Sequence, residues 1–119
     1  MPLIQIRRQQ SKIDATVLFD IIRNLHAVAA KALTCEESGE LVPGDIMIEV
    51  DDMNTVFDSN LKDIHIRVWA HDYPSRRDNL DAIRKRIADE VLKHLVSGTS
   101  WYVWVLLAPT SYGSDTEEK

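Results

Sequence analysis

The chain has 119 residues, a length typical of one folded domain, and 45% of them are hydrophobic against 28% charged. This balance excludes a disordered chain, and a formal net charge of −5 argues against a dedicated nucleic-acid binder, which needs a basic surface. The single cysteine, Cys35, excludes an internal disulfide and a thiolate-rich zinc site. No apolar run approaches the roughly 20 residues of a membrane span, and no signal-peptide pattern opens the chain. We therefore expect a cytoplasmic protein that binds neither nucleic acid nor membranes.

The first half of the chain predicts a strand, a helix and a second strand. Leu3–Arg8 (LIQIRR) is short and partly alternating, which is typical of a strand. In 14–33 the apolar residues recur every three or four positions, which predicts a helix with one apolar stripe. Two glycines and a proline make 36–44 a loop, and alternation over 46–50 predicts the second strand.

The second half repeats this pattern. The segment 64–67 (IHIR) stands sixty positions after 4–7 (IQIR), and an apolar stripe over 80–95 stands sixty-two positions after 18–33. Ser75 is the expected N-cap of this second helix, with Asp78 in its first turn. The last strand is expected at 102–107. We expect one domain over 1–113, followed by a flexible acidic tail over 114–119.

The element order predicts an α/β (α+β) fold made of two β-α-β units. Two helices cover one face of a four-stranded sheet, because each parallel pair of strands needs a crossover helix. The other face has no cover in this chain, and an exposed apolar sheet face usually marks an interface. We therefore expect a homo-oligomer, with this face carrying two tryptophans and the aliphatic residues Ile4, Ile6, Ile64, Ile66, Val103 and Val105.

Pro2 is the residue that bears most directly on function. Removal of Met1 would leave a free prolyl amine, a base with a reference pKa of roughly 7.7–8.0. Desolvation and neighbouring cations would lower that pKa, so that the amine is neutral and basic near pH 7. The strand that starts at Leu3 would hold the amine at the sheet edge. Many proteins begin with Met-Pro for no catalytic reason, which is the alternative interpretation.

These features resemble the tautomerase superfamily. The shared pattern is a proline directly after Met1, an immediate strand, the duplicated β-α-β order and the length near 120 residues. The closest members in pattern are cis-3-chloroacrylic acid dehalogenase and malonate semialdehyde decarboxylase. Their first helix carries a histidine at the position of His26, and the turn before their second helix carries arginine, as in VWAHDYPSRRDNLDAI. The resemblance covers roughly 2–113 and implies the tautomerase fold, four strands with two helices on one face, and a homotrimer.

The resemblance also implies roles for individual residues. Pro2 matches the catalytic acid/base, and His26 matches a histidine that binds substrate or orients water, although a boundary histidine at the core edge is equally compatible with its place on the helix stripe. Arg76 or Arg77 matches an arginine that binds the substrate carboxylate. A second arginine of the dehalogenase turn falls on Asp72, which is a departure from the pattern.

Further candidates could supply the positive charge or the aromatic wall that a carboxylate pocket needs. Arg8, Arg67 or Arg7 could replace the missing arginine. Trp104 falls near the pocket aromatic of the last strand, though core or interface packing is the alternative for it. The carboxylate that activates water in the dehalogenase has no counterpart after Pro109, which favours proton shuttling over hydrolysis.

The sequence thus predicts a cofactor-independent tautomerase, an isomerase of small 2-oxo or enol carboxylic acids. The alternatives are a decarboxylase or a hydratase/dehalogenase-type lyase on the same fold, and a non-catalytic oligomeric binding protein. No metal site is expected, because the four histidines are never spaced two or four residues apart.

Overall fold

A computed structural model describes residues 1–54, 56–111, 113 and 114 of the chain. In chain order the elements are β1 (Leu3–Arg8), α1 (Ala15–Leu33), the short 3-10 helix η1 (Pro43–Asp45), β2 (Met47–Asp52), β3 (Ile64–His71), α2 (Pro74–Asp78), α3 (Leu80–Leu92) and β4 (Trp101–Ala108). The predicted strands and the first helix are confirmed; their ends differ by at most two residues, except that β3 continues four residues beyond the segment 64–67. Most of the expected acidic tail lies outside the described residues.

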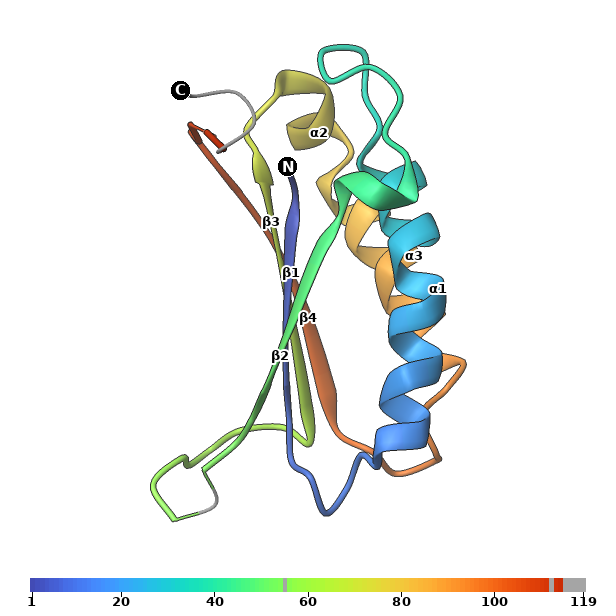
Figure 1. Cartoon of the computed structure of the whole chain (residues 1–119), viewed down its shortest axis with the longest axis vertical. Helices are drawn as coiled ribbons and strands as arrows, with labels where there is room; N and C mark the ends of the chain where they lie inside the picture. The colour runs from blue at the N-terminus through green and yellow to red at the C-terminus, as the bar shows by residue number, and fades with distance from the viewer. Residues whose placement is uncertain (55, 112, 115–119) are drawn as a thin grey trace.

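The four strands form one mixed sheet in the order β2-β1-β3-β4. β1 pairs in parallel with β2, and β3 pairs in parallel with β4, so each half of the chain is a β-α-β unit. The two units join where β1 runs antiparallel to β3, with Ile6 opposite Ile66. Figure 1 shows the helices on one side of the sheet and no helix of the described chain on the other, as the duplicated order predicts.

Local chemistry explains where α1 begins and which side it buries. Asp14 is the N-cap, and its side chain accepts a hydrogen bond from the backbone N–H of Val17 at 2.9 Å. The apolar stripe then faces the sheet, where Ile21, Leu25 and Ala29 are fully buried. At the far end the Thr34 hydroxyl donates to the carbonyl of Ala30 at 2.7 Å and ends the helix.

The second helix differs from the prediction, because it is divided into α2 and α3 and Ser75 is not its N-cap. Pro74 occupies the first helical position, where a missing N–H costs nothing, so α2 starts one residue before Ser75. Asn79 leaves helical geometry and its side-chain amide donates to the Ser75 carbonyl at 2.8 Å, which separates the two helices. Asp78 therefore ends α2, and Asp81 lies in the first turn of α3.

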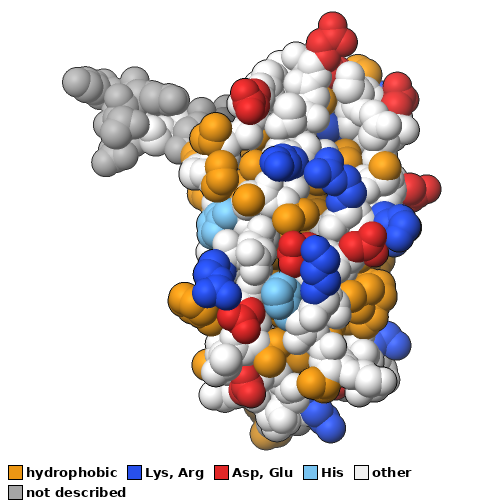
Figure 2. Space-filling view, turned by 90° about the vertical axis from the view of Figure 1, so that its right-hand side faces the viewer, with side chains coloured by type: hydrophobic (Ala, Val, Ile, Leu, Met, Phe, Trp, Pro, Cys, Tyr) orange, Lys and Arg blue, Asp and Glu red, His pale blue; other side chains and the backbone are white. Residues whose placement is uncertain are grey.

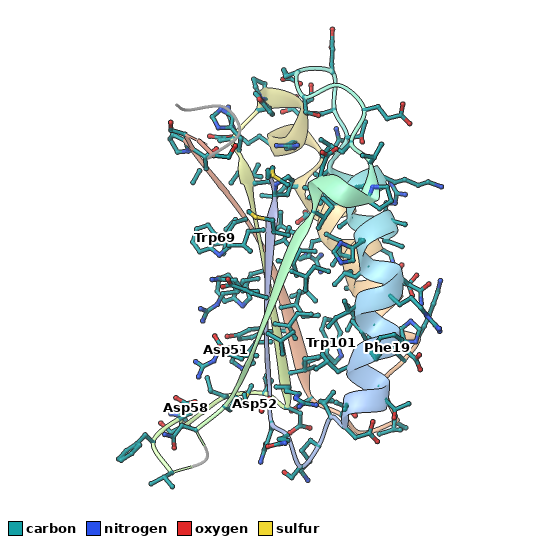
Figure 3. All side chains as sticks on the ribbon, in the orientation of Figure 1. Phe19, Asp51, Asp52, Asp58, Trp69 and Trp101 are labelled. Carbon is teal, nitrogen blue, oxygen red and sulfur yellow. The ribbon has the colours of Figure 1, made fainter. Side chains whose placement is uncertain are left out.

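The assignment of the two sheet faces also needs correction. The register places Ile4, Ile6, Ile64, Ile66, Val103 and Val105 on the helix side, and all but the partly buried Val105 are in the core. The uncovered face carries the alternate residues instead: aromatic and polar side chains together with the apolar residues Leu3, Met47 and Leu106 beside Trp69. In Figure 3, Trp101 lies between sheet and helices, whereas Trp69 projects from the uncovered side. Side chains alternate across a strand, so the aliphatic set and the uncovered set cannot be the same.

Polar contacts organise this uncovered face. The Trp69 indole N–H donates to Gln5 Oε1 at 2.8 Å, and Gln5 Nε2 donates to Glu49 at 2.7 Å. Trp69 and Trp104 nevertheless keep 39% and 52% of their surface exposed. Two large aromatic side chains on an open sheet still mark this face as a candidate interface.

Candidate active site

The first residues of the chain are fixed by the sheet. The Pro2 carbonyl accepts a hydrogen bond from the Met47 N–H at 3.0 Å, which extends the β1–β2 ladder beyond Leu3. Pro2 is buried, whereas Met1 is half exposed. The predicted strand start at Leu3 is confirmed, but β1 lies between β2 and β3, so Pro2 precedes a central strand and does not lie at an edge of the sheet.

A cavity of about 370 Å³ opens beside Pro2. Five segments contribute to its wall: the chain start, the loop after α1, η1, the turn from β3 into α2, and the stretch after β4. The elements meet at the end of the sheet where β1 begins and β3 and β4 finish, at the top of Figure 1. The lining residues are Met1, Pro2, Glu37, Ser38, Glu40, Leu41, Asp45, His71, Tyr73, Arg76 and Thr110.

Arg76 is the cation of this cavity, and it is buried with only 3% of its surface exposed. Its Nε donates to the carbonyl of Leu33 at 2.9 Å, and its Nη1 donates to the carbonyl of His71 at 3.1 Å. The guanidinium also lies 5.0 Å from the ring centroid of Tyr73. Arg76 thus ties the end of α1 to the end of β3, and Nη2 is the one terminal nitrogen without a hydrogen bond to the described chain.

Arg77, the other arginine of the turn, points away from the cavity. Its Nε donates to Asp72 Oδ1 at 2.9 Å on the exposed side of α2. The hydrogen bond and the charge of Asp72 raise the pKa of Arg77 above its ordinary value. Asp72 therefore neutralises Arg77, and of the two predicted arginines of this turn only Arg76 lines the cavity.

Three carboxylates also line the cavity, and none of them was among the predicted site residues. Glu37 accepts a hydrogen bond from the Ser75 N–H at 3.1 Å, and the Ser75 hydroxyl and N–H lower the pKa of Glu37. Glu40 and Asp45 complete an acidic side, and none of the three forms an ion pair within the described chain. These loop residues come near Pro2 only in the folded chain. The acidic residues within 36–40 were the one feature of the sequence that could have pointed to them.

His71 and Tyr73 form the opposite wall, with ring centroids 4.6 Å apart. The Thr110 N–H donates to His71 Nδ1 at 3.1 Å, which makes Nδ1 an acceptor and leaves the proton of the neutral ring on Nε2. The pair can donate hydrogen bonds to a bound oxygen. Neither residue was among the predicted site residues, because their roles depend on the chain returning after β4.

The remaining predicted residues do not line this cavity. His26 is half-buried on α1. Arg8 lies at the other end of β1, where it binds Asp52 at 2.8 Å and the Ile13 carbonyl at 3.0 Å. Arg67 and Trp104 are register partners on the uncovered sheet face. Within one copy of the chain, only Pro2 and Arg76 of the predicted set come together.

The described residues lack two kinds of feature. They contain no group of three or more His, Cys, Asp or Glu side chains able to hold a metal ion. None of their helices is long and apolar enough to cross a membrane.

Comparison with solved structures identifies the fold. The chain superimposes with a TM-score of 0.67 on FG41 malonate semialdehyde decarboxylase inhibited by 3-bromopropiolate, at 13% identity over 95% of this chain and 90% of that one. For a macrophage migration inhibitory factor-like protein from Entamoeba histolytica the TM-score is 0.65, at 11% identity over 96% of this chain and 95% of that one. For a fused 4-OT described as an asymmetric trimer the TM-score is 0.62, at 15% identity over 95% of this chain and 92% of that one.

The chain has the tautomerase fold. These likenesses run through the whole β-α-β duplication, because more than nine-tenths of the chain is matched in each case. No protein-family model matches the sequence, and no curated protein sequence is significantly similar to it. At such low identities the tautomerase fold is shared, and the chemistry must be argued from the residues of the cavity.

Proposed function

We propose that this tautomerase-fold protein is a cofactor-independent tautomerase of small 2-oxo or enol carboxylic acids, with the Pro2 amine as its acid/base group. The observation that carries the proposal is the burial of Pro2 at the start of β1, beside a cavity that also holds Arg76. The proposal requires removal of Met1, because only then is the proline nitrogen an amine. A proton taken from one carbon of the substrate and returned to another then completes the reaction without a cofactor.

The cavity offers a partner for each part of such a substrate. Nη2 of Arg76 is available for the carboxylate, since the other contacts of that side chain hold the guanidinium in place. His71 Nε2 and the Tyr73 hydroxyl are candidate donors to the developing enolate oxygen. His26 keeps its predicted role in substrate binding only if a neighbouring copy or a moving segment brings it to the cavity.

The acidic side of the cavity favours a second candidate, a decarboxylase or hydratase-type lyase. Glu37, Glu40 and Asp45 stabilise a positive charge nearby, and Arg76 is the single side-chain cation to oppose them. These surroundings favour the protonated form of the Pro2 amine, contrary to the expectation that neighbouring cations keep it neutral. A protonated amine serves as a proton donor. Decarboxylation requires one, because loss of carbon dioxide leaves an enolate that must gain a proton.

We also propose that the chain acts as a homotrimer. Two of the similar solved structures are described as trimers of 4-OT, and the uncovered sheet face here exposes Trp69 and Trp104. The residues available for the interface differ from the prediction: this face offers aromatic rings, polar groups and the apolar side chains of Leu3, Met47 and Leu106, and not the predicted isoleucines and valines.

The decisive experiment compares the parent with Pro2→Ala, using phenylenolpyruvate and 2-hydroxymuconate as substrates. Intact mass first establishes whether Met1 is absent. We expect Pro2→Ala to lower kcat at least tenfold, and Pro43→Ala, a matched change on the exposed η1, to leave kcat unchanged. Equal activity of Pro2→Ala and parent, or retention of Met1, would support the non-catalytic binding protein.

The pH profile separates the two enzymatic candidates. An amine that acts as a base gains activity as the pH rises and the proton leaves, whereas an amine that acts as a proton donor loses activity over the same range. A rising limb assigned to Pro2 supports the tautomerase, and a falling limb supports the lyase.

A further inference from the structure

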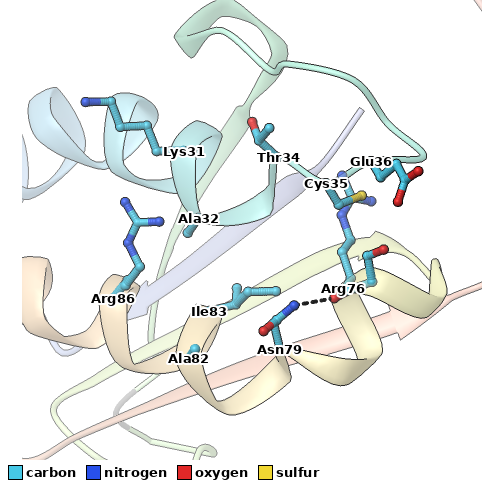
Figure 4. A pocket seen from close by; sticks show the side chains of 11 residues that line it. Lys31, Ala32, Thr34, Cys35, Glu36, Arg76, Asn79, Ala82, Ile83 and Arg86 are labelled. Carbon is cyan, nitrogen blue, oxygen red and sulfur yellow. Dashed lines mark hydrogen bonds between the residues drawn. The ribbon is translucent and has the colours of Figure 1, made fainter.

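A second cavity of about 380 Å³ lies between the end of α1 and the beginning of α3 (Figure 4). We call it the α1–α3 cleft. It is formed by α1, the turn after it, α2 and α3, and it shares only Arg76 with the cavity at Pro2. Its volume is within the range of about 300–1,000 Å³ that is usual for small-molecule sites.

Small side chains create the space. Ala32 on α1 and Ala82 on α3 line the cleft where longer residues would close the gap between the helices. Ile83 adds apolar surface, and Arg76 supplies a buried polar wall at one end. One side of the cleft is therefore apolar, Arg76 is a buried charged group at its end, and the exposed charged residues Lys31, Glu36 and Arg86 lie at its rim.

The rim carries two cations without ion-pair partners in the described chain, Lys31 and Arg86. Figure 4 shows Arg86 reaching from α3 toward α1, which carries Lys31. The acidic residues one turn beyond Arg86 are already occupied, because Asp89 binds Lys85 at 3.2 Å and Glu90 binds His94 at 2.9 Å.

The surroundings of Lys31 contain no acidic partner on its own helix face. The positions three and four residues away are all uncharged: Ala27, Val28, Thr34 and Cys35. Glu36 is the single carboxylate that lines the cleft, and it forms no ion pair in the described chain. Figure 2 shows Lys and Arg side chains on this helix-covered side of the molecule, with Asp and Glu side chains among them. The cleft is thus locally positive in a chain of net charge −5, the reverse of the acidic cavity at Pro2.

We propose that the α1–α3 cleft binds a small organic anion. Its carboxylate or phosphate group lies between Lys31 and Arg86, where charge-assisted hydrogen bonds supply most of the recognition. Its apolar body lies over Ala32 and Ile83. The site does not depend on the reaction proposed at Pro2, and Arg76 separates the two cavities while contacting both.

The test is a ¹⁵N chemical-shift titration of the full chain with benzoate, phenyl phosphate and uncharged benzamide. We expect the anions to shift amide signals of 31–36 and 79–86, and benzamide to bind at least tenfold more weakly. Arg86→Gln and Lys31→Gln should each weaken anion binding at least fivefold. Arg84→Gln is the matched control, since it removes the same charge from an exposed position of α3 that does not line the cleft.

The single cysteine gives an independent readout. Cys35 lines the cleft, so a bound anion should slow its alkylation by iodoacetamide in the parent and not in Arg86→Gln. Binding of one anion class alone assigns the site to carboxylates or to phosphates, and binding of both assigns it to their shared oxyanion chemistry. Equal binding of benzamide, or shifts that Arg86→Gln and Arg84→Gln affect alike, would overturn the proposal.

Discussion

Replacing Arg76 should destabilise the fold far more than replacing its neighbour Arg77. Arg76 is buried and bridges two elements through the carbonyls of Leu33 and His71. Arg77 is exposed and binds only Asp72 on the same surface turn. The two residues are adjacent and chemically identical, so the comparison isolates the effect of position.

The magnitude follows from the two hydrogen bonds. A hydrogen bond from a charged donor contributes about 1.5–3 kcal/mol, and a carbonyl left buried without a donor adds its desolvation cost. Arg76→Met keeps much of the apolar stem and removes both donors, so we expect a loss of about 3–5 kcal/mol in the free energy of unfolding. That is a large part of the roughly 5–15 kcal/mol available to a domain. Arg77→Met should leave stability near that of the parent, because exposed ion pairs contribute little.

Urea denaturation followed by tryptophan fluorescence measures both variants at one protein concentration, so that any oligomer contributes equally. Arg76→Lys should fall between parent and Arg76→Met, since an ammonium keeps the charge but cannot reach both carbonyls as a guanidinium does. Equal midpoints for the Arg76→Met and Arg77→Met variants would refute this account of the turn.

Three further predictions concern histidines and the uncovered sheet face. Burial, with the charges of Arg67 and Arg7, lowers the pKa of His65, and its Nε2 accepts the Lys62 N–H at 3.0 Å. Because folding favours the neutral ring, the free energy of unfolding should fall as the pH drops below about 6.5. His65→Gln should weaken this pH dependence in denaturation curves. His26→Ala should lower kcat at least tenfold with little change in Tm if the residue reaches the substrate, and a lower Tm with unchanged kcat would assign it to the core edge. Trp104→Glu should shift the sedimentation coefficient from trimer toward monomer, and an unchanged value would remove this face from the interface.

Sequence periodicity by itself determined most of the secondary structure and the division into two β-α-β units, whereas the order of the strands in the sheet came from the structure. Apolar spacing located α1, and the sixty-residue offset between IQIR and IHIR revealed the duplication. These signals are local, because a helix or strand that buries one face must repeat its apolar residues at 3.6 or 2 positions. The position of Pro2 was visible in the same way, since the strand that holds it starts at the next residue.

Tertiary structure alone decided which side chains meet at the cavity. The sequence could not distinguish Arg76 from Arg77, because a change of one helical position turns a side chain by about 100°. Since the sequence did not show where α2 begins, it did not show which of the two side chains faces the cavity. It also could not bring Glu37 and His71 to Pro2, since the three residues come from a chain start, a loop and a strand end. The sign of the charge around Pro2 depends on these long-range contacts, and charge at the site, rather than the fold, separates a proton acceptor from a proton donor.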